Sequence, residues 1–336
     1  MRVTRLHELC VVAVVLPVIT IVGCHSGEQT GALSAGSAPP CAPCQAGLRG
    51  DLNGNGNPDI TDAVGILRII VGLDPANALG DCDCDGATGI TDAIALLRCL
   101  VGLDEWPIYC GEMVGPDGQT LVWVPGGSFM MGSDAWEDEL PVHRVTLDGF
   151  WIGQCEVTNA QYRAFCDATG RAFPAGSDQA DDHPVCLVNW ADAQAYCGHY
   201  GYALPTEAQW EYAARGPAVP TYPWGNAWDE LRCCNSGNQG PGGTTFPVGS
   251  FPAGASWCGA LDMAGNVWEW CADWYAAAYY EASPEENPAG PATGTNRVLR
   301  GGSWDDDDDY CRAAIRGSLL PSFPSSYSGF RVARNR

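Results

Sequence analysis

The chain has 336 residues and a formal net charge of −23, from 40 acidic and 17 basic side chains. Nucleic acids and anionic lipid headgroups are polyanions, so this charge excludes them as expected partners and favours divalent cations. Every basic residue is an arginine. That excludes chemistries that require a lysine, including phosphate-binding loops, protein-kinase catalysis and Schiff-base formation.

Residues 1–23 have the pattern of a bacterial export signal. Arg2 and Arg5 precede an apolar run from Leu9 to Val22 that is too short for a comfortable membrane span. The following Gly23-Cys24 resembles a lipobox, which implies a lipid anchor on Cys24. The alternative is ordinary cleavage and release. We therefore predict an exported protein, either secreted or held at the cell envelope, that meets the membrane only through its N-terminal lipid.

Residues 24–48 are rich in Gly, Ser, Ala and Pro and lack an apolar period, as expected of a flexible tether. Of the 17 cysteines, Cys10 lies in the signal and Cys24 at the lipobox, which leaves 15. Export to an oxidising compartment predicts that most of these are paired in disulfides, and the odd number leaves at least one thiol free or intermolecular.

Residues 50–74 and 80–104 are a duplication, with 13 identities in 25 aligned positions. Each copy begins with regularly spaced oxygen-bearing side chains and a glycine, which is typical of a calcium-binding loop, and continues into an amphipathic helix. The helix faces, which we expect to bury each other, carry Ala63, Ile66, Leu67 and Ile70 in the first copy and Ala93, Leu96, Leu97 and Leu100 in the second. The predicted ligands are Asp51, Asn53, Asn55, Asn57, Asp59 and Asp62 in the first loop, and Asp81, Asp83, Asp85, Ala87 and Asp92 in the second.

This small all-α module, residues 49–105, resembles a type I dockerin with EF-hand-like calcium loops. The resemblance implies two bound calcium ions and docking onto a cohesin-bearing protein. Recognition would involve the Ile-Thr pairs at residues 60–61 and 90–91. The alternative is a calcium-stabilised stalk without a cohesin partner.

Residues 106–119 are predicted to be a linker, and residues 120–336 are long enough for one large domain. The segment LVWVPGGSFMMGS predicts two short strands around a Gly-Gly turn. Three helices are expected to follow, capped by Thr158, by Asn189, and by Thr206 with Gln209. The remainder is rich in Gly, Pro and Trp, which predicts little regular structure and long packed loops.

Eight motifs occur in order along this domain: VPGGSFMMGS, EVTNAQYRAFC, HPVCLVNWADAQAYC, LPTEAQWEYAARG, YPWGN, MAGNVWEWCADW, RVLRGGSW and GFRVAR. Together they resemble the formylglycine-generating enzyme, or sulfatase-modifying-factor, family. The resemblance implies an α+β fold that is C-type-lectin-like and low in regular secondary structure, often stabilised by calcium.

The stretch DMAGNVWEW predicts a calcium site in this domain. Asp262 and Glu269 supply carboxylates, and Gly265 and Val267 supply backbone carbonyls, in agreement with the calcium motif of the family. The alternative is that Trp268 and Trp270 are core residues and Glu269 only covers them. A second family calcium site would involve Asn235, although GNQGPGGTT, residues 237–245, lacks the acidic partner that the resemblance implies.

The stretch RGGSWDDDDDYC, residues 300–311, occupies the place of the family's oxidase centre. In the oxidases, two cysteines five residues apart bind copper(I) and engage the substrate thiol. Here an aspartate near position 306 replaces the first cysteine, which leaves Ser303 and Cys311 as the candidate catalytic residues. The alternatives are that Cys311 belongs to the CRxAxR motif of members without oxidase activity, that it sits in a disulfide, or that it packs beneath Trp304 as a small buried hydrophobic residue. Copper(I) prefers thiolates and carboxylates prefer hard cations, so we expect no working copper centre.

Three functions remain open for the domain. The first is a non-catalytic, lectin-like module that binds a peptide, a glycan or a sulfatase. The second is an accessory component of a polysaccharide-degrading or sulfatase-containing assembly. The third is an oxidase that converts a sulfatase cysteine to formylglycine, which the family resemblance implies and the missing thiol opposes.

Overall fold

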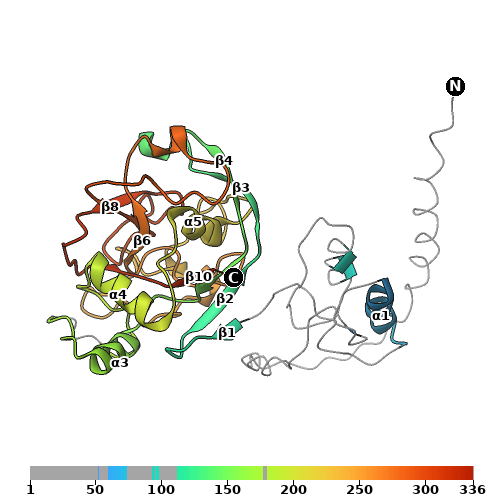
Figure 1. Ribbon diagram of the computed structural model, residues 1–336, viewed down its shortest axis with the longest axis horizontal. Helices are drawn as coiled ribbons and strands as arrows, with labels where there is room; N and C mark the ends of the chain where they lie inside the picture. The colour runs from blue at the N-terminus through green and yellow to red at the C-terminus, as the bar shows by residue number, and fades with distance from the viewer. Residues whose placement is uncertain are drawn as a thin grey trace. The chain divides into compact units, whose positions relative to one another are not determined.

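The computed structural model describes Leu52 and residues 60–73, 93–94, 96–97, 112–176 and 180–335 (Figure 1). All predicted ligands of the two N-terminal calcium loops except Asp62 lie outside these residues, as do Cys24 and the expected signal, tether and Leu100. None of the described helices is long and apolar enough to cross a membrane.

Helix α1 (Ile60–Ile70) begins at the Ile-Thr pair of the first repeat, where a helix was predicted. Ala63 and Ile66 are buried against Ala93 and Leu96, which occupy the equivalent positions of the second repeat. The prediction that the two helix faces bury each other is confirmed for these residues. It is wrong for Leu67, Ile70 and Leu97, which are about 40 % exposed, because helices this short contact each other along only one narrow stripe.

The C-terminal domain contains a four-stranded antiparallel sheet in the order β1-β2-β5-β10. Its strands are β1 (Glu112–Val114), β2 (Thr120–Val124), β5 (Phe150–Gly153) and β10 (Ala333–Asn335). Strand β1 lies inside the segment that was expected to be linker. The turn after it is also part of the fold, because Asp117 accepts hydrogen bonds from the hydroxyls of Tyr196 and Tyr202.

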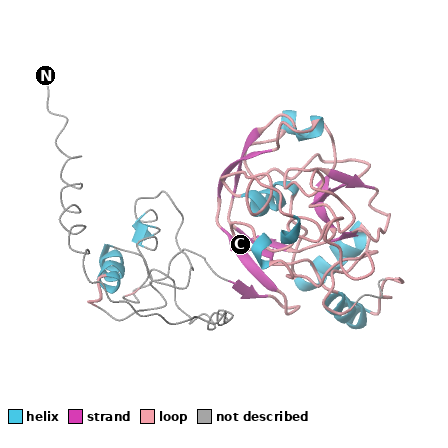
Figure 2. Ribbon diagram, turned by 180° about the vertical axis from the view of Figure 1, so that it is seen from behind, coloured by secondary structure: helices cyan, strands magenta, loops and turns pink. Residues whose placement is uncertain are grey.

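The other strands of the domain form two further sheets. Strands β3 (Gly127–Met131) and β4 (His143–Leu147) form an antiparallel pair. The third sheet has the order β8-β7-β6-β9, with β6 (Trp268–Trp274), β7 (Arg297–Arg300), β8 (Gly317–Leu319) and β9 (Ser328–Gly329). The two strands predicted around the Gly-Gly turn are confirmed as β2 and β3. Loops connect most of the remaining chain, as the composition predicted (Figure 2).

The three predicted helices are α3 (Asn159–Thr169), α4 (Trp190–Tyr200) and α5 (Glu207–Arg215). Thr158, Asn189 and Thr206 cap them, each within a complete capping box. In each box the cap side chain accepts a hydrogen bond from the N–H of the third helical residue, whose side chain accepts one from the N–H of the cap residue. Both N–H groups would otherwise lack a partner in the first turn. Helix α5 contacts both β3 and β6, and all of its residues except Gln209 are buried (Figure 1).

Four buried arginines from the last part of the chain fasten α5 and its surroundings. Each one pairs with a glutamate that lies far away in the sequence. The guanidinium group stays charged and offers several donors in one plane, so it suits buried carboxylates better than lysine does. These pairs give a structural use to the all-arginine composition: Arg300 with Glu211, Arg312 with Glu139, Arg316 with Glu207, and Arg331 with Glu269.

Candidate functional site

Asp306 is the one aspartate of residues 305–309 that is not exposed. One carboxylate oxygen, Oδ2, accepts hydrogen bonds from the backbone N–H of Ser303 at 2.9 Å, from the Ser303 hydroxyl at 2.5 Å and from Trp268 Nε1 at 2.9 Å. Its carbonyl oxygen accepts a bond from the N–H of Ser236. Ser303, one of the two candidate catalytic residues, therefore holds Asp306 in position.

Cys311, the other candidate, is fully buried and faces a second cysteine. It packs with Cys233 and Ala264 in a small apolar cluster, against which Trp224 and Trp228 also pack. A hydrogen bond with the Cys233 side chain, followed by burial, raises the pKa of Cys311 well above its usual range. A thiol with a raised pKa is a poor nucleophile and a poor metal ligand, because the thiolate is the reactive form.

The remaining aspartates of the stretch, residues 305 and 307–309, are exposed. They do not assemble into a metal site: no group of three His, Cys, Asp or Glu side chains converges on a possible metal position anywhere in the described part of the chain. The stretch is flanked by aromatic contacts. Trp304 stacks on Tyr327 at 5.1 Å between ring centroids, and the rings of Tyr310 and Trp136 meet edge to face.

The stretch from Asp262 to Val267 is a tight turn that joins several distant segments. Asp262, Gly265 and Asn266 all have positive φ, at 56°, 72° and 61°. A Cβ atom at Gly265 would lie 1.9 Å from the carbonyl oxygen of Cys234, so only glycine fits there. Asn266 bridges Glu156 Oε1 and the N–H of Phe246 through its amide. Val267 is completely buried beside this turn.

Glu269, a predicted calcium ligand, has both carboxylate oxygens engaged by protein donors. Arg331 binds it in a bidentate manner, at 2.6 Å to Oε2 and 2.7 Å to Oε1, and Trp210 Nε1 donates to Oε2 at 2.7 Å. Asp262 accepts a bond from the N–H of Gly249 at 2.6 Å, and the positive charge of Arg331 also acts on it. The predicted calcium site at Asp262, Gly265, Val267 and Glu269 remains a prediction, and Arg331 competes for one of its carboxylates.

Sequence reasoning missed Glu156, the buried neighbour of Asp262. Burial and the charge of Asp262 raise the pKa of Glu156 well above its usual value, and burial also raises the pKa of Asp262. Glu156 Oε2 has no hydrogen-bond donor among the described residues. Three carboxyls thus share the single guanidinium of Arg331, and buried charge of this kind must be neutralised by protons or by a cation. The signal available in the sequence was a glutamate, Glu156, between the apolar residues Cys155 and Val157, a position where burial is expected.

Asn235, the residue of the second predicted calcium site, is buried and holds its own turn. Its Nδ2 donates to the carbonyl oxygens of Glu230 and Cys233, and its Oδ1 accepts from the N–H of Gly237 at 2.9 Å. The amide therefore has a structural use without a metal. A calcium ion at Asn235 remains a prediction.

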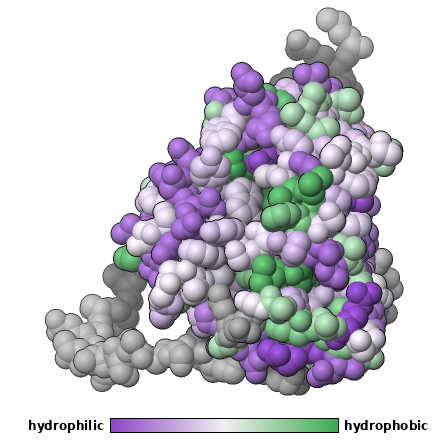
Figure 3. Space-filling model, turned by 90° about the vertical axis from the view of Figure 1, so that its left-hand side faces the viewer, coloured by the Kyte–Doolittle hydropathy of each residue, from purple (hydrophilic) through white to green (hydrophobic). Residues whose placement is uncertain are grey.

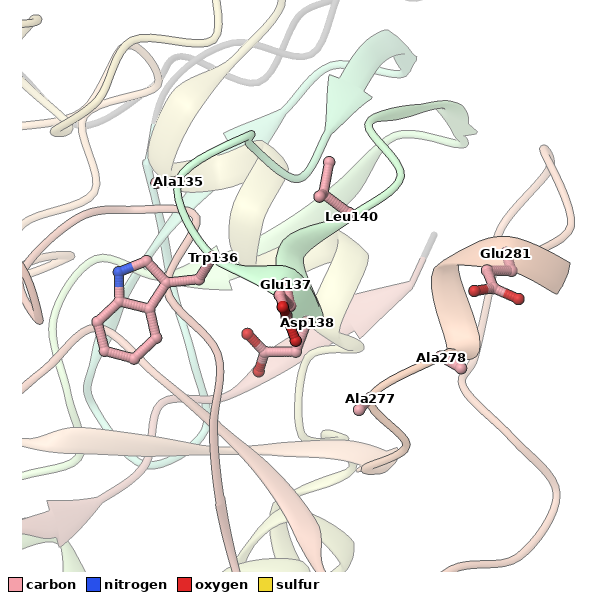
Figure 4. A pocket seen from close by; sticks show the side chains of 8 residues that line it. All are labelled: Ala135, Trp136, Glu137, Asp138, Leu140, Ala277, Ala278 and Glu281. Atoms are coloured by element: carbon pink, nitrogen blue, oxygen red, sulfur yellow. The ribbon is translucent and has the colours of Figure 1, made fainter.

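An open groove of about 660 Å³ lies between residues 135–140 and residues 277–281 (Figure 4). All charged groups that line it are acids: Glu137 and Asp138 lie on one wall and Glu281 on the other. The half-exposed Trp136 and Leu140 supply apolar surface. The face of the molecule drawn in Figure 3 is mostly polar, with separate hydrophobic patches. Sequence patterns gave no indication of the groove, because its two walls are about 140 residues apart.

Residues 112–336 match the family described as "Sulfatase-modifying factor enzyme 1-like domain". The chain belongs to this family. It is 37 % identical over 283 residues to the formylglycine-generating enzyme of Streptomyces coelicolor, a match that covers 63 % of this chain and 88 % of that protein. The predicted resemblance of the C-terminal domain to the formylglycine-generating enzymes is thereby confirmed. The dockerin resemblance of residues 49–105 remains a prediction.

Two solved structures share the fold. Treponema denticola variable protein 1 is 26 % identical with a TM-score of 0.60, covering 67 % of this chain and 99 % of that one. PvdO from Pseudomonas aeruginosa is 28 % identical with a TM-score of 0.60, covering 67 % and 98 %. These matches confirm the predicted mixed helix and sheet fold of the family.

Proposed function

We propose that this protein is a binding member of the family without formylglycine-generating oxidase activity. The state of Cys311 carries the proposal: its thiol is fully buried and its pKa is raised. Asp306, which stands where the resemblance expects the other cysteine, is tied to Ser303 and Trp268. A hard carboxylate and a protonated thiol do not fit copper(I), which selects thiolates. The residues present therefore do not match the oxidase's metal.

The direct test is an aldehyde assay. The purified protein is incubated with copper, oxygen and a peptide that carries a sulfatase-type Cys-x-Pro-x-Arg sequence, with the Streptomyces coelicolor enzyme as positive control. We expect no aldehyde by mass spectrometry. The 37 % identity to that enzyme favours the oxidase as the second candidate function. Aldehyde that forms with the wild-type protein and disappears in Cys311→Ala would establish the oxidase instead.

For the ligand of the binding module we propose a cationic peptide or glycan held in the groove of Figure 4. Three carboxylates without a basic residue in the lining attract positive charge, and the half-exposed Trp136 and Leu140 add apolar surface for the rest of the ligand. Titration with an arginine-rich peptide, compared with a glutamate-rich one, measures this preference. Glu281→Gln should weaken binding, whereas Glu230→Gln, also exposed but outside the groove lining, should not.

For residues 49–105 we propose a calcium-binding, dockerin-like module on an exported protein, with a cohesin-bearing protein as its partner. One described contact supports a closed first loop: Asp62 is buried and its Oδ1 accepts a bond from the N–H of Leu52 at 3.0 Å, ten residues earlier. Asp62→Ala should remove one bound calcium from the full chain, measured by equilibrium dialysis. A panel of cohesins tests the partner, and unchanged calcium stoichiometry in the variant would count against the loop.

A further inference from the structure

Cys233 and Cys234 are neighbours in the sequence with different surroundings. The backbone at Cys233 is extended, with φ −152° and ψ 167°, and successive side chains on extended backbone point to opposite sides. Cys234 directs its thiol toward the carbonyl oxygen of Thr244 at 3.7 Å. Cys233 instead packs in the apolar cluster with Cys311.

The two segments that carry Cys233 and Cys311 already contact each other at further points. The N–H of Ser236 donates to the carbonyl oxygen of Asp306 at 2.8 Å, and Gln239 Nε2 donates to Asp305 Oδ1 at 3.2 Å. Asn235 Nδ2 lies 3.4 Å from Cys233 Sγ. Both thiols are buried, at 2 % and 0 % exposure, so the pair is held in place from both sides.

We propose that Cys233 and Cys311 form a disulfide bond that fastens the acidic stretch to the segment around Asn235. Two thiols packed in one buried cluster, on separately anchored segments, need little movement to reach bonding distance. The two S–H bonds break, one S–S bond forms, and two protons and two electrons pass to a disulfide-containing oxidant, which becomes two thiols. A protein disulfide-exchange catalyst or oxidised glutathione supplies that chemistry.

The proposal goes beyond the binding function and can fail separately from it. A disulfide would withdraw Cys311 from thiol chemistry, but a reduced Cys311 would leave ligand binding in the groove unaffected. Closing a loop between positions 233 and 311 restricts the unfolded chain strongly, so the bond should also stabilise the domain.

Peptide mapping without reduction tests the link on the full-length protein. Trypsin releases GGSWDDDDDYCR, residues 301–312, in which Cys311 is the only cysteine, and a peptide that begins at Cys233 and ends at Arg297. We expect these two peptides to be joined, with a mass two hydrogens below their sum. The joined species should be absent in Cys233→Ala and present in Cys234→Ala, the matched control.

Thermal unfolding gives a second readout. Reduction should lower the melting temperature of the wild-type protein by about 10 °C more than it lowers that of Cys233→Ala. Cys234→Ala should respond to reduction like the wild type. The proposal is overturned by alkylation of both thiols in the denatured, unreduced protein, or by a link from Cys311 to any cysteine other than Cys233. Copper(I) bound by this pair of free thiols would also overturn it.

Discussion

Two acidic regions of this domain have similar chemistry and opposite surroundings. Four of the five aspartates at residues 305–309 are exposed to solvent. Glu156, Asp262 and Glu269 are buried around one guanidinium, that of Arg331, and the pKa values of Glu156 and Asp262 are raised. Water stabilises the first group, whereas the protein must stabilise the second. Electrostatic interactions therefore contribute more to the stability of the fold at the buried carboxyls than at the run of five aspartates.

The largest effect should follow from Glu269→Ala. The substitution leaves the buried Arg331 without its bidentate partner and removes the acceptor of Trp210 Nε1. Breaking one half of a buried ion pair costs about 3–5 kcal/mol in the free energy of unfolding. Urea denaturation followed by tryptophan fluorescence measures the loss. Glu269→Gln, which keeps an oxygen acceptor, should lose less, and a loss below about 1 kcal/mol in Glu269→Ala would contradict the importance of the pair.

The buried carboxyl of Asp273 should make the stability of the protein depend on pH. Burial and the charge of Glu207 raise its pKa to about 7. A raised pKa means that the folded state favours the protonated form. The stability from this group is fully present below its unfolded pKa, near 4, and is lost as the pH rises through about 7.

Asp273→Asn stays neutral and keeps an oxygen for the N–H of Glu207, which donates to Asp273 Oδ2 at 2.8 Å. The variant should therefore gain stability relative to the wild type as the pH is raised from about 4 to about 7, by a few kcal/mol. Melting temperatures across this range check it. Parallel curves for the two proteins would show that Asp273 does not titrate in the window.

Calcium should affect the buried carboxyls and the exposed aspartates differently. If a divalent cation neutralises Glu156 and Asp262, about 100-fold excess of free calcium over its dissociation constant should add about 3 kcal/mol to the free energy of unfolding. Asp262→Ala should abolish this gain in the C-terminal domain, and Asp307→Ala should preserve it. A gain that persists in Asp262→Ala would assign the ion to another position.

Much of the fold was predictable because its signals are local. The capping residues Thr158, Asn189 and Thr206 act on backbone groups within three positions, so sequence alone fixed where the helices begin. Strand β1 was missed because three residues, EMV, carry no period of their own. They become a strand only through pairing with β2.

The site was less predictable because its partners are distant in sequence. Ser303, Cys311 and Glu269 were named as candidates from motifs. Sequence spacing gave no sign that Cys311 packs against Cys233 or that Arg331 forms an ion pair with Glu269. Glu156 was passed over for the same reason, since its meeting with Asp262 depends on the turn at Gly265. Long-range pairing of side chains requires the tertiary fold.

The smallest effect should come from the exposed acidic stretch. Asp307→Asn and Asp308→Asn remove charges that water already solvates, and surface substitutions of this kind change the free energy of unfolding by about 0.5 kcal/mol or less. Each substitution should stabilise the protein slightly, because neighbouring like charges repel each other. Raising the salt concentration should remove the difference from the wild type, because salt screens the repulsion.

Asp306→Asn is the matched comparison within the same stretch. It leaves a neutral acceptor for three donors from Ser303 and Trp268 and should destabilise the protein instead. Equal effects at positions 306 and 307 would show that the hydrogen bonds of Asp306 contribute nothing to stability.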